Sequence, residues 1–130
     1  MKKLTCHCGG VEIQVKLPDA GFEKLMRCNC SLCKRRGYIM TPVDPINFKI
    51  IKGQDFLKLY QYHTKVAEHY FCSVWGIYTH HKPCTNPNMR TINVACLENI
   101  NPFDLKDILT KDGVNHPLDN KKWKKQKIVF

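Results

Sequence analysis

Three cysteines within six residues place the strongest constraint on how this chain can fold. Residues 28–33 have the spacing C-x-C-x-x-C and are followed directly by the basic residues 34–36. Three thiols this close in sequence meet at one point only when the backbone turns sharply, and a soft metal cation is the usual reason for such a turn. The motif therefore predicts a zinc site with Cys28, Cys30 and Cys33 as its protein ligands.

Other cysteines indicate a second cluster. Cys6 and Cys8 are separated by one residue, and Cys72 precedes a predicted tight turn at Trp75-Gly76. A cysteine at position 75 would complete a C-x-x-C knuckle and a four-thiolate site. An indole cannot ligate zinc through its N–H, so this second cluster is incomplete as it stands.

Eight cysteines could instead form four disulfides in a secreted protein. The first six residues are basic but lack the apolar segment of a signal peptide, which favours metal binding in the cytoplasm. No apolar run approaches the roughly 20 residues that a membrane-spanning helix needs. We therefore expect a cytoplasmic protein without a membrane segment.

The charge balance favours anionic partners. The 130-residue chain has a formal net charge of +10, and part of this surplus lies in the lysine-rich segment 121–127, which also contains Trp123. Nucleic acid, an acidic metabolite or an acidic protein would suit such a surface, although a merely solvated lysine-rich surface would look the same. We expect one zinc domain over residues 1–120 and a basic tail over 121–130.

Short strands dominate the predicted secondary structure. Residues 11–17 alternate apolar and polar side chains, as expected for a half-buried strand. Further strand candidates cover residues 38–40, 48–51, 56–62, 66–72, 77–80 and 91–97. One helix start is convincing, with Asn101 as the cap and Pro102 at the first helical position.

The order of these motifs resembles the glutathione-dependent formaldehyde-activating enzyme family, whose domain is shared by centromere protein V. The segments that carry the resemblance are C-x-C-G at residues 6–9, C-x-C-x-x-C at 28–33, HYFC at 69–72, GIYTHH at 76–81, RTINVACL at 90–97 and DGVNHP at 112–117. The likeness extends to about Asp119.

This resemblance implies a mainly β, Mss4-like fold of several small coiled antiparallel sheets with zinc knuckles and one short helix. It also implies two zinc sites. Cys28, Cys30 and Cys33 match the active-site zinc ligands of the family. Cys6, Cys8 and Cys72 match three of its four structural zinc ligands.

Trp75 departs from the family pattern at the fourth structural ligand. Either this zinc is lost or weakened and Trp75 packs into the space, or Cys84 or a histidine such as His80 supplies the missing ligand. We favour the weakened or lost site, because removing a ligand sacrifices much of the folding energy that a structural zinc supplies.

The resemblance further implies zinc-dependent carbon–sulfur lyase chemistry on an adduct of a small anionic thiol such as glutathione, with formaldehyde as one candidate carbonyl. A fourth ligand donated from a distant histidine would instead make the three-cysteine site structural.

Single residues carry further expectations. His69 either faces a site or lies on the strand surface, and at most one of His80 and His81 points toward the metal. Cys96 is expected to belong to the core. The alternative function is a non-enzymatic zinc module that binds nucleic acid or an acidic protein. The sequence does not define an oligomeric state.

Overall fold

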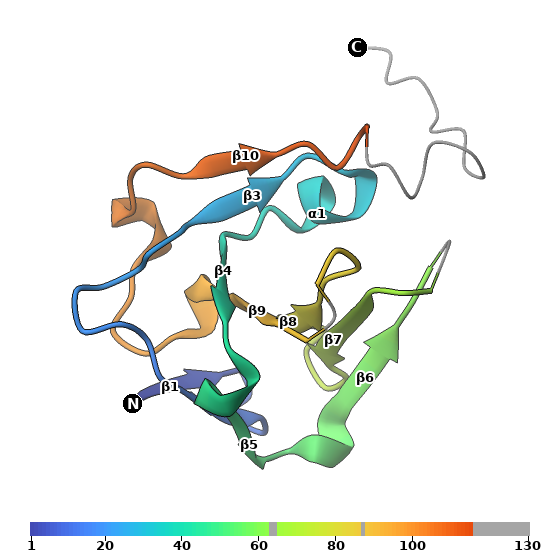
Figure 1. Cartoon of the computed structure of the whole chain (residues 1–130). Helices are drawn as coiled ribbons and strands as arrows, with labels where there is room; N and C mark the ends of the chain where they lie inside the picture. The colour runs from blue at the N-terminus through green and yellow to red at the C-terminus, as the bar shows by residue number, and fades with distance from the viewer. Residues whose placement is uncertain (63–64, 87, 116–130) are drawn as a thin grey trace.

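Two β-sheets make up the computed structural model, which describes residues 1–62, 65–86 and 88–115 (Figure 1). The smaller sheet has the strand order β1-β2-β5, with β1 at Lys2–Thr5, β2 at Glu12–Val15 and β5 at Phe48–Lys52. Val11, Ile13 and Val15 are fully buried, whereas the intervening polar side chains are half-buried. The predicted alternation is therefore confirmed.

The larger sheet has the strand order β10-β3-β4-β9-β8-β7-β6. Its strands are β3 Met26–Cys28, β4 Met40–Val43, β6 Leu57–Tyr60, β7 Glu68–Cys72, β8 Tyr78–Lys82, β9 Arg90–Asn93 and β10 Leu109–Lys111. All neighbours pair antiparallel except β10, which pairs parallel with β3. The prediction of a mainly β fold of small sheets is confirmed.

The helical elements are short, and the predicted helix start at Asn101 and Pro102 is confirmed as a single 3₁₀ turn. The α-helix of the described residues is α1, Ser31–Arg36, inside the central cysteine motif. Four 3₁₀ turns complete the set: η1 Pro45–Asn47, η2 Gln54–Phe56, η3 Val94–Cys96 and η4 Pro102–Asp104. Asn101 does cap η4 by accepting a hydrogen bond from the N–H of Phe103, but the helix extends for one turn only.

Two strand boundaries also differ from the prediction. The strand expected at residues 38–40 begins at Met40 and continues through Pro42 to Val43. The strand expected at residues 91–97 ends at Asn93, whose side chain accepts a hydrogen bond from the N–H of Ala95 and so caps η3. Asparagine competes with the strand ladder through such local hydrogen bonds, which explains the early end.

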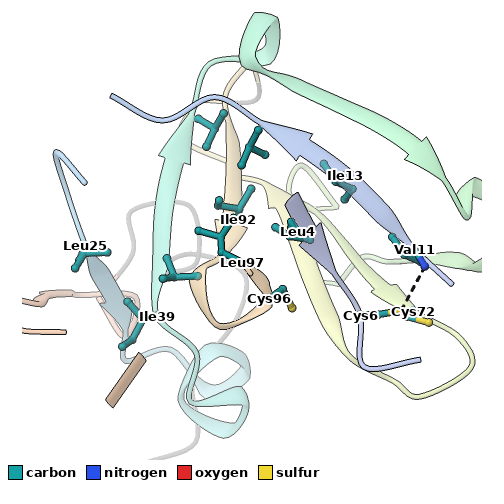
Figure 2. Close-up of a cluster of buried hydrophobic side chains, with 13 residues drawn as sticks. Leu4, Cys6, Val11, Ile13, Leu25, Ile39, Cys72, Ile92, Cys96 and Leu97 are labelled. Atoms are coloured by element: carbon teal, nitrogen blue, oxygen red, sulfur yellow. Dashed lines mark hydrogen bonds between the residues drawn. The ribbon is translucent and has the colours of Figure 1, made fainter. Parts of the chain in front are cut away.

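The main core lies between the two sheets. Figure 2 shows Leu4 and Ile13 of the smaller sheet facing Ile92 and Leu97, and Cys6 lying beside Cys72. A smaller buried cluster consists of Cys30, Cys33, Tyr38, Met40 and Tyr78. Each predicted metal motif is therefore part of a different packed cluster, so the thiols are held in place by the folded chain.

Within the described ranges, no helix is long and apolar enough to cross a membrane. The basic segment 121–130, including Trp123, lies outside the described residues. The domain boundary near residue 120 and the binding of nucleic acid or an acidic protein by this segment stay predictions.

Candidate metal centres

The change from strand to helix brings the three central thiols together. Cys28 ends β3, Cys30 is the N-cap of α1, and Cys33 lies in the first turn of α1. The Sγ atoms of these residues all lie within 4.8 Å of one another. The sequence prediction that Cys28, Cys30 and Cys33 converge is thus confirmed, and we call this set the three-cysteine cluster.

Backbone hydrogen bonds hold these sulfur atoms in place. The N–H of Cys33 donates to Sγ of Cys30 at 3.3 Å, and the N–H of Cys30 donates to Sγ of Cys28 at 3.5 Å. Gly37 ends the helix in the left-handed conformation with φ 62°, which glycine adopts without a steric penalty. Gly37 therefore ends the basic segment that follows the cysteine motif.

The three thiols share negative charge. Hydrogen bonds from the thiols of Cys28 and Cys33 lower the pKa of Cys30 far below its ordinary value of 9.0. The hydrogen bond to Cys30 raises the pKa of Cys28, and the hydrogen bonds to Cys28 and then to Cys30 raise the pKa of Cys33. A soft divalent cation would replace the shared protons and stabilise all three thiolates at once.

A loop from the end of the described chain closes over the cluster. Oδ1 of Asn29 accepts hydrogen bonds from the N–H groups of Gly113 at 2.7 Å and Val114 at 3.2 Å. In the parallel β3–β10 ladder, Lys111 lies directly opposite Cys28. Gly113 lies 84 positions from Asn29 in sequence, and it thus forms part of the wall around the thiols.

The cluster opens onto a small pocket of about 80 Å³. Its walls include the three cysteines together with His69, His81, Cys84, Lys111 and Gly113. No histidine nitrogen or carboxylate oxygen of the described chain joins the thiols within 4.8 Å. A tetrahedral ion held by these three sulfur atoms would have a fourth position that no histidine or carboxylate of the described residues fills.

The two histidines that line this pocket each bond a buried tyrosine. Oη of Tyr38 lies 2.9 Å from Nδ1 of His81, and Oη of Tyr78 lies 2.6 Å from Nδ1 of His69. The two imidazole rings stack with centroids 5.2 Å apart. Each hydrogen bond fixes the orientation of its imidazole ring. Because both bonds use Nδ1, neither of them involves Nε2.

Both imidazoles are neutral at pH 7. Burial, with a contribution from the Arg36 guanidinium, lowers the pKa of His69 to about 4. Burial, with contributions from His69 and Lys111, lowers the pKa of His81 to about 3. A neutral imidazole can donate or accept one hydrogen bond at Nε2, so the pair can interact with either form of a thiol.

Arg36 adds a fixed positive charge beside these residues. Its Cζ atom lies 3.9 Å from the centroid of the Tyr78 ring, a cation–π contact. Nη1 of Arg36 is buried and has no hydrogen-bond partner among the described residues. The ring face of Tyr78 therefore supports the guanidinium in place of a carboxylate.

Cys6, Cys8 and Cys72 form the second cluster, as predicted, with their sulfur atoms within 4.8 Å of one another. Sγ of Cys8 lies 3.0 Å from Sγ of Cys6 and 3.5 Å from Sγ of Cys72. All eight cysteines are free, so the disulfide alternative is not realised. Figure 2 shows the hydrogen bond that the N–H of Val11 donates to Cys6.

In the second cluster too, hydrogen bonds between the thiols lower the pKa of one cysteine and raise the pKa of another. Burial raises the pKa of Cys6, but hydrogen bonds from the Cys8 thiol and from Val11 outweigh it and lower the pKa to about 7. The bond to Cys6 raises the pKa of Cys8 to about 11. The second cluster is therefore also prepared to hold a cation, but it provides three ligands only.

None of the expected substitutes completes the second cluster. Trp75 does not pack into the space, because its side chain is 59% exposed and makes an edge-on contact with His7. His80 is buried elsewhere, with Nδ1 2.9 Å from Oγ1 of Thr79. Cys84 lies in the wall of the other pocket. These three expectations for the fourth position were wrong.

The remaining sequence expectations divide as follows. Cys96 is buried in the main core, as predicted. Of the adjacent histidines, His81 lines the pocket and His80 does not, as the alternation of strand faces predicts. His69 also lines the pocket, so the site alternative for this residue is the one that the structure supports.

Sequence reasoning missed Tyr38, Tyr78, Lys111 and Gly113. The two tyrosines are buried with Cys30 and Cys33, and in the sequence they look like ordinary core residues. Lys111 and Gly113 are brought to the cysteines only by the β3–β10 pairing.

Comparisons with known proteins agree with this arrangement. The sequence model of the glutathione-dependent formaldehyde-activating enzyme family matches residues 1–110. The chain belongs to this family. The chain is also similar to a Rhodobacter sphaeroides protein whose crystal structure was solved as a structural genomics target, with 45% sequence identity and a TM-score of 0.79. That match covers 84% of this chain and 99% of the other.

Proposed function

We propose that this protein is a zinc-dependent carbon–sulfur lyase-like enzyme that acts on an adduct between a glutathione-type thiol and a small carbonyl compound. Family membership supports a thiol substrate. The observation that carries the proposal is the three-cysteine cluster, which meets a pocket with no fourth described donor within 4.8 Å. A purely structural site would surround its metal with four protein ligands.

The donor set fits zinc. Three thiolates within 4.8 Å, supported by two N–H···S bonds, match the soft ligands that Zn²⁺ takes in tetrahedral sites. Cys28, Cys30 and Cys33 would hold this ion, and Cys6, Cys8 and Cys72 would hold a second ion more weakly. When bound, zinc supplies Lewis acidity and a means of keeping a thiol deprotonated at neutral pH.

The reaction class is reversible addition of a thiol to a carbonyl. In the addition direction the thiol loses its proton, the sulfur–carbon bond forms, the carbonyl π electrons move to oxygen, and that oxygen takes a proton. In the lyase direction the hydroxyl loses its proton, the carbonyl re-forms, and the carbon–sulfur bond breaks with its electron pair on sulfur. His69 and His81 are neutral and line the pocket, so they can exchange this proton or hydrogen-bond the carbonyl oxygen.

The test is direct thiol binding. Zinc-loaded protein is titrated with glutathione by calorimetry and compared with Cys30→Ser, which removes one ligand, and with Cys96→Ala, which removes a buried thiol outside both clusters. We expect binding by the wild type and Cys96→Ala and none by Cys30→Ser. Absence of glutathione binding by the fully zinc-loaded wild type would contradict the proposal.

Activity on the adduct is measured separately. Glutathione and formaldehyde form a hemithioacetal in solution, and the rate of its formation or breakdown is followed by exchange-sensitive NMR. The wild type is expected to accelerate this exchange above the uncatalysed rate, and Cys30→Ser is not. Binding without acceleration would make the protein a thiol-binding module and not a lyase.

A further inference from the structure

A second, larger cavity adjoins the three-cysteine pocket. It has a volume of about 410 Å³ and lies between the β3–β10 pair and residues 83–89. Met40, His81, Pro83 and Lys111 line both spaces. The volume falls within the roughly 300–1,000 Å³ of typical small-molecule sites, whereas the pocket at the thiols is far smaller. The two spaces together suit a ligand with a small reacting end and a larger remainder.

The charges around this combined space have one sign. Lys24 and Lys111 line the larger cavity, and no acidic side chain of the described chain lines either space. Neither lysine forms an ion pair with a carboxylate in the described ranges. Two lysines at a lining without acidic side chains create a positive potential that favours carboxylates.

The backbone holds both lysines at defined positions relative to the thiols. Lys111 pairs with Cys28 in the parallel ladder, and its carbonyl accepts a hydrogen bond from the N–H of Asn29 at 3.2 Å. The carbonyl of Lys24 accepts a hydrogen bond from Oγ1 of Thr41 at 2.6 Å. Lys111 therefore lies where the two spaces meet, and Lys24 lies in the larger cavity only.

We propose that the larger cavity binds the anionic, non-reacting part of the thiol substrate, with Lys111 and Lys24 as the residues that select thiols bearing carboxylates. This inference rests on the proposed function, since it assumes that the substrate sulfur reaches the three-cysteine cluster. The walls of Met26, Met40, Met89 and Leu109 would cover the aliphatic part of a peptide-like thiol, and Asn86 would offer amide hydrogen bonds.

The two lysines should contribute unequally. Lys111 is half-buried, so its interaction with a carboxylate is poorly screened, and its loss should weaken glutathione binding roughly tenfold. Lys24 is exposed, and its loss should cost about two- to fivefold. A thiol without carboxylates should bind all variants alike.

The experiment compares glutathione with 2-mercaptoethanol, which is neutral, on the zinc-loaded full chain. Calorimetric titrations use the wild type, Lys111→Gln, Lys24→Gln and the charge-retaining Lys111→Arg. Lys49→Gln is the matched control, because Lys49 is exposed on β5 of the smaller sheet and lines neither space. Zinc content of each variant is measured first, so that only chains with the wild-type metal content are compared.

We expect Lys111→Gln and Lys24→Gln to bind glutathione more weakly than the wild type and to bind mercaptoethanol equally well. Lys111→Arg should bind glutathione with nearly wild-type affinity. Lys49→Gln should bind both thiols as the wild type does. Unchanged glutathione affinity in both glutamine variants, with mercaptoethanol still bound, would overturn this inference and leave the proposed function intact. Equal weakening for both thiols would also overturn it, because the lysines would then support the fold or the metal. Failure of the wild type to bind either thiol would overturn both proposals.

Discussion

Gly113 packs directly against Cys28: a Cβ atom at position 113 would lie 2.5 Å from Sγ of Cys28 and 2.7 Å from Cβ of Cys30. Real Cβ atoms do not approach other atoms this closely, so either the loop or the thiols would have to move. The demand for glycine here comes from space at the cluster and not from a left-handed backbone. The loop at residues 112–114 is therefore part of the metal centre's support.

Gly113→Ala should weaken metal binding at the three-cysteine cluster. Displacing residues that position metal ligands typically costs about 10–100-fold in affinity, and we expect a loss in this range. Competition with a chromogenic chelator measures it. Val114→Ala, one residue further in the same loop, keeps the backbone hydrogen bonds to Asn29 and should retain wild-type affinity. Wild-type affinity in Gly113→Ala would show that the loop yields without cost.

Trp75→Cys should strengthen the second cluster. Trp75 is 59% exposed in the turn between β7 and β8, and it lies three residues after Cys72, so replacing it removes little packing and restores a C-x-x-C knuckle. A fourth thiolate should raise zinc affinity there roughly tenfold or more and stabilise the fold when zinc is present. Zinc content after dialysis against a weak chelator measures the effect.

Val74→Cys is the matched control for that experiment. Val74 is 55% exposed and adjoins Trp75, but a thiol at this position has the wrong spacing for a knuckle with Cys72. Tighter zinc binding in Val74→Cys as well would mean that any added thiol suffices. No gain in Trp75→Cys would mean that the turn directs position 75 away from the cluster.

Tyr38→Phe should destabilise the protein by about 1–3 kcal/mol, because it leaves Nδ1 of buried His81 without its partner. Urea unfolding of the zinc-loaded protein measures the change. Tyr70→Phe is the comparison: Tyr70 is half-buried and its hydroxyl bonds Glu68, so water can replace the lost contact and the cost should be smaller. Equal costs would indicate that the Tyr38–His81 bond contributes little.

His80 should make stability depend on pH. Its ring packs between Tyr70 and Phe48, each with a centroid distance of 4.8 Å, and burial, aided by Arg90 and Lys82, lowers its pKa from 6.5 to about 3. Between these values the unfolded chain binds the proton and the folded chain does not. Stability therefore falls as the pH drops from about 6.5 toward 3, by up to about 1.4 kcal/mol per pH unit from this residue.

The measurement is the difference in unfolding free energy between the wild type and His80→Gln at each pH, which cancels contributions common to both chains. We expect the unfolding free energy of His80→Gln to depend less steeply on pH than that of the wild type. His7→Gln replaces an exposed histidine and should follow the wild type. A wild-type slope in His80→Gln would show that His80 becomes protonated without cost.

Local residue patterns were enough to predict the two cysteine clusters and one strand of the smaller sheet. The C-x-C-x-x-C spacing predicted the three-cysteine cluster because ligands within six residues need only one turn and a short helix to meet. The grouping of Cys6 and Cys8 with Cys72 followed from the tight turn after Cys72, and the family resemblance supported it. The half-buried strand at residues 12–15 followed from its period of two, because one buried face is enough to specify a strand.

Contacts between distant segments decided what local patterns could not. A single asparagine ended the strand at residue 93, and the motif's own short helix was missed because six residues carry too little periodicity to distinguish a helix from a turn. Cys84 and His80 were plausible ligands in sequence, but Cys84 lies in the wall of the three-cysteine pocket and His80 is buried opposite Tyr70 in the β7–β8 pair.

The sequence by itself determined which residues can bind metal, because ligand chemistry and short spacing are local properties of a chain. Only the tertiary structure decided what surrounds them. The parallel β3–β10 pairing brings Lys111 and Gly113 to Cys28, and the β7–β8 hairpin brings His69 and His81 to the same pocket. These contacts depend on strand register and on burial against a shared core, and both arise from the fold of the whole chain.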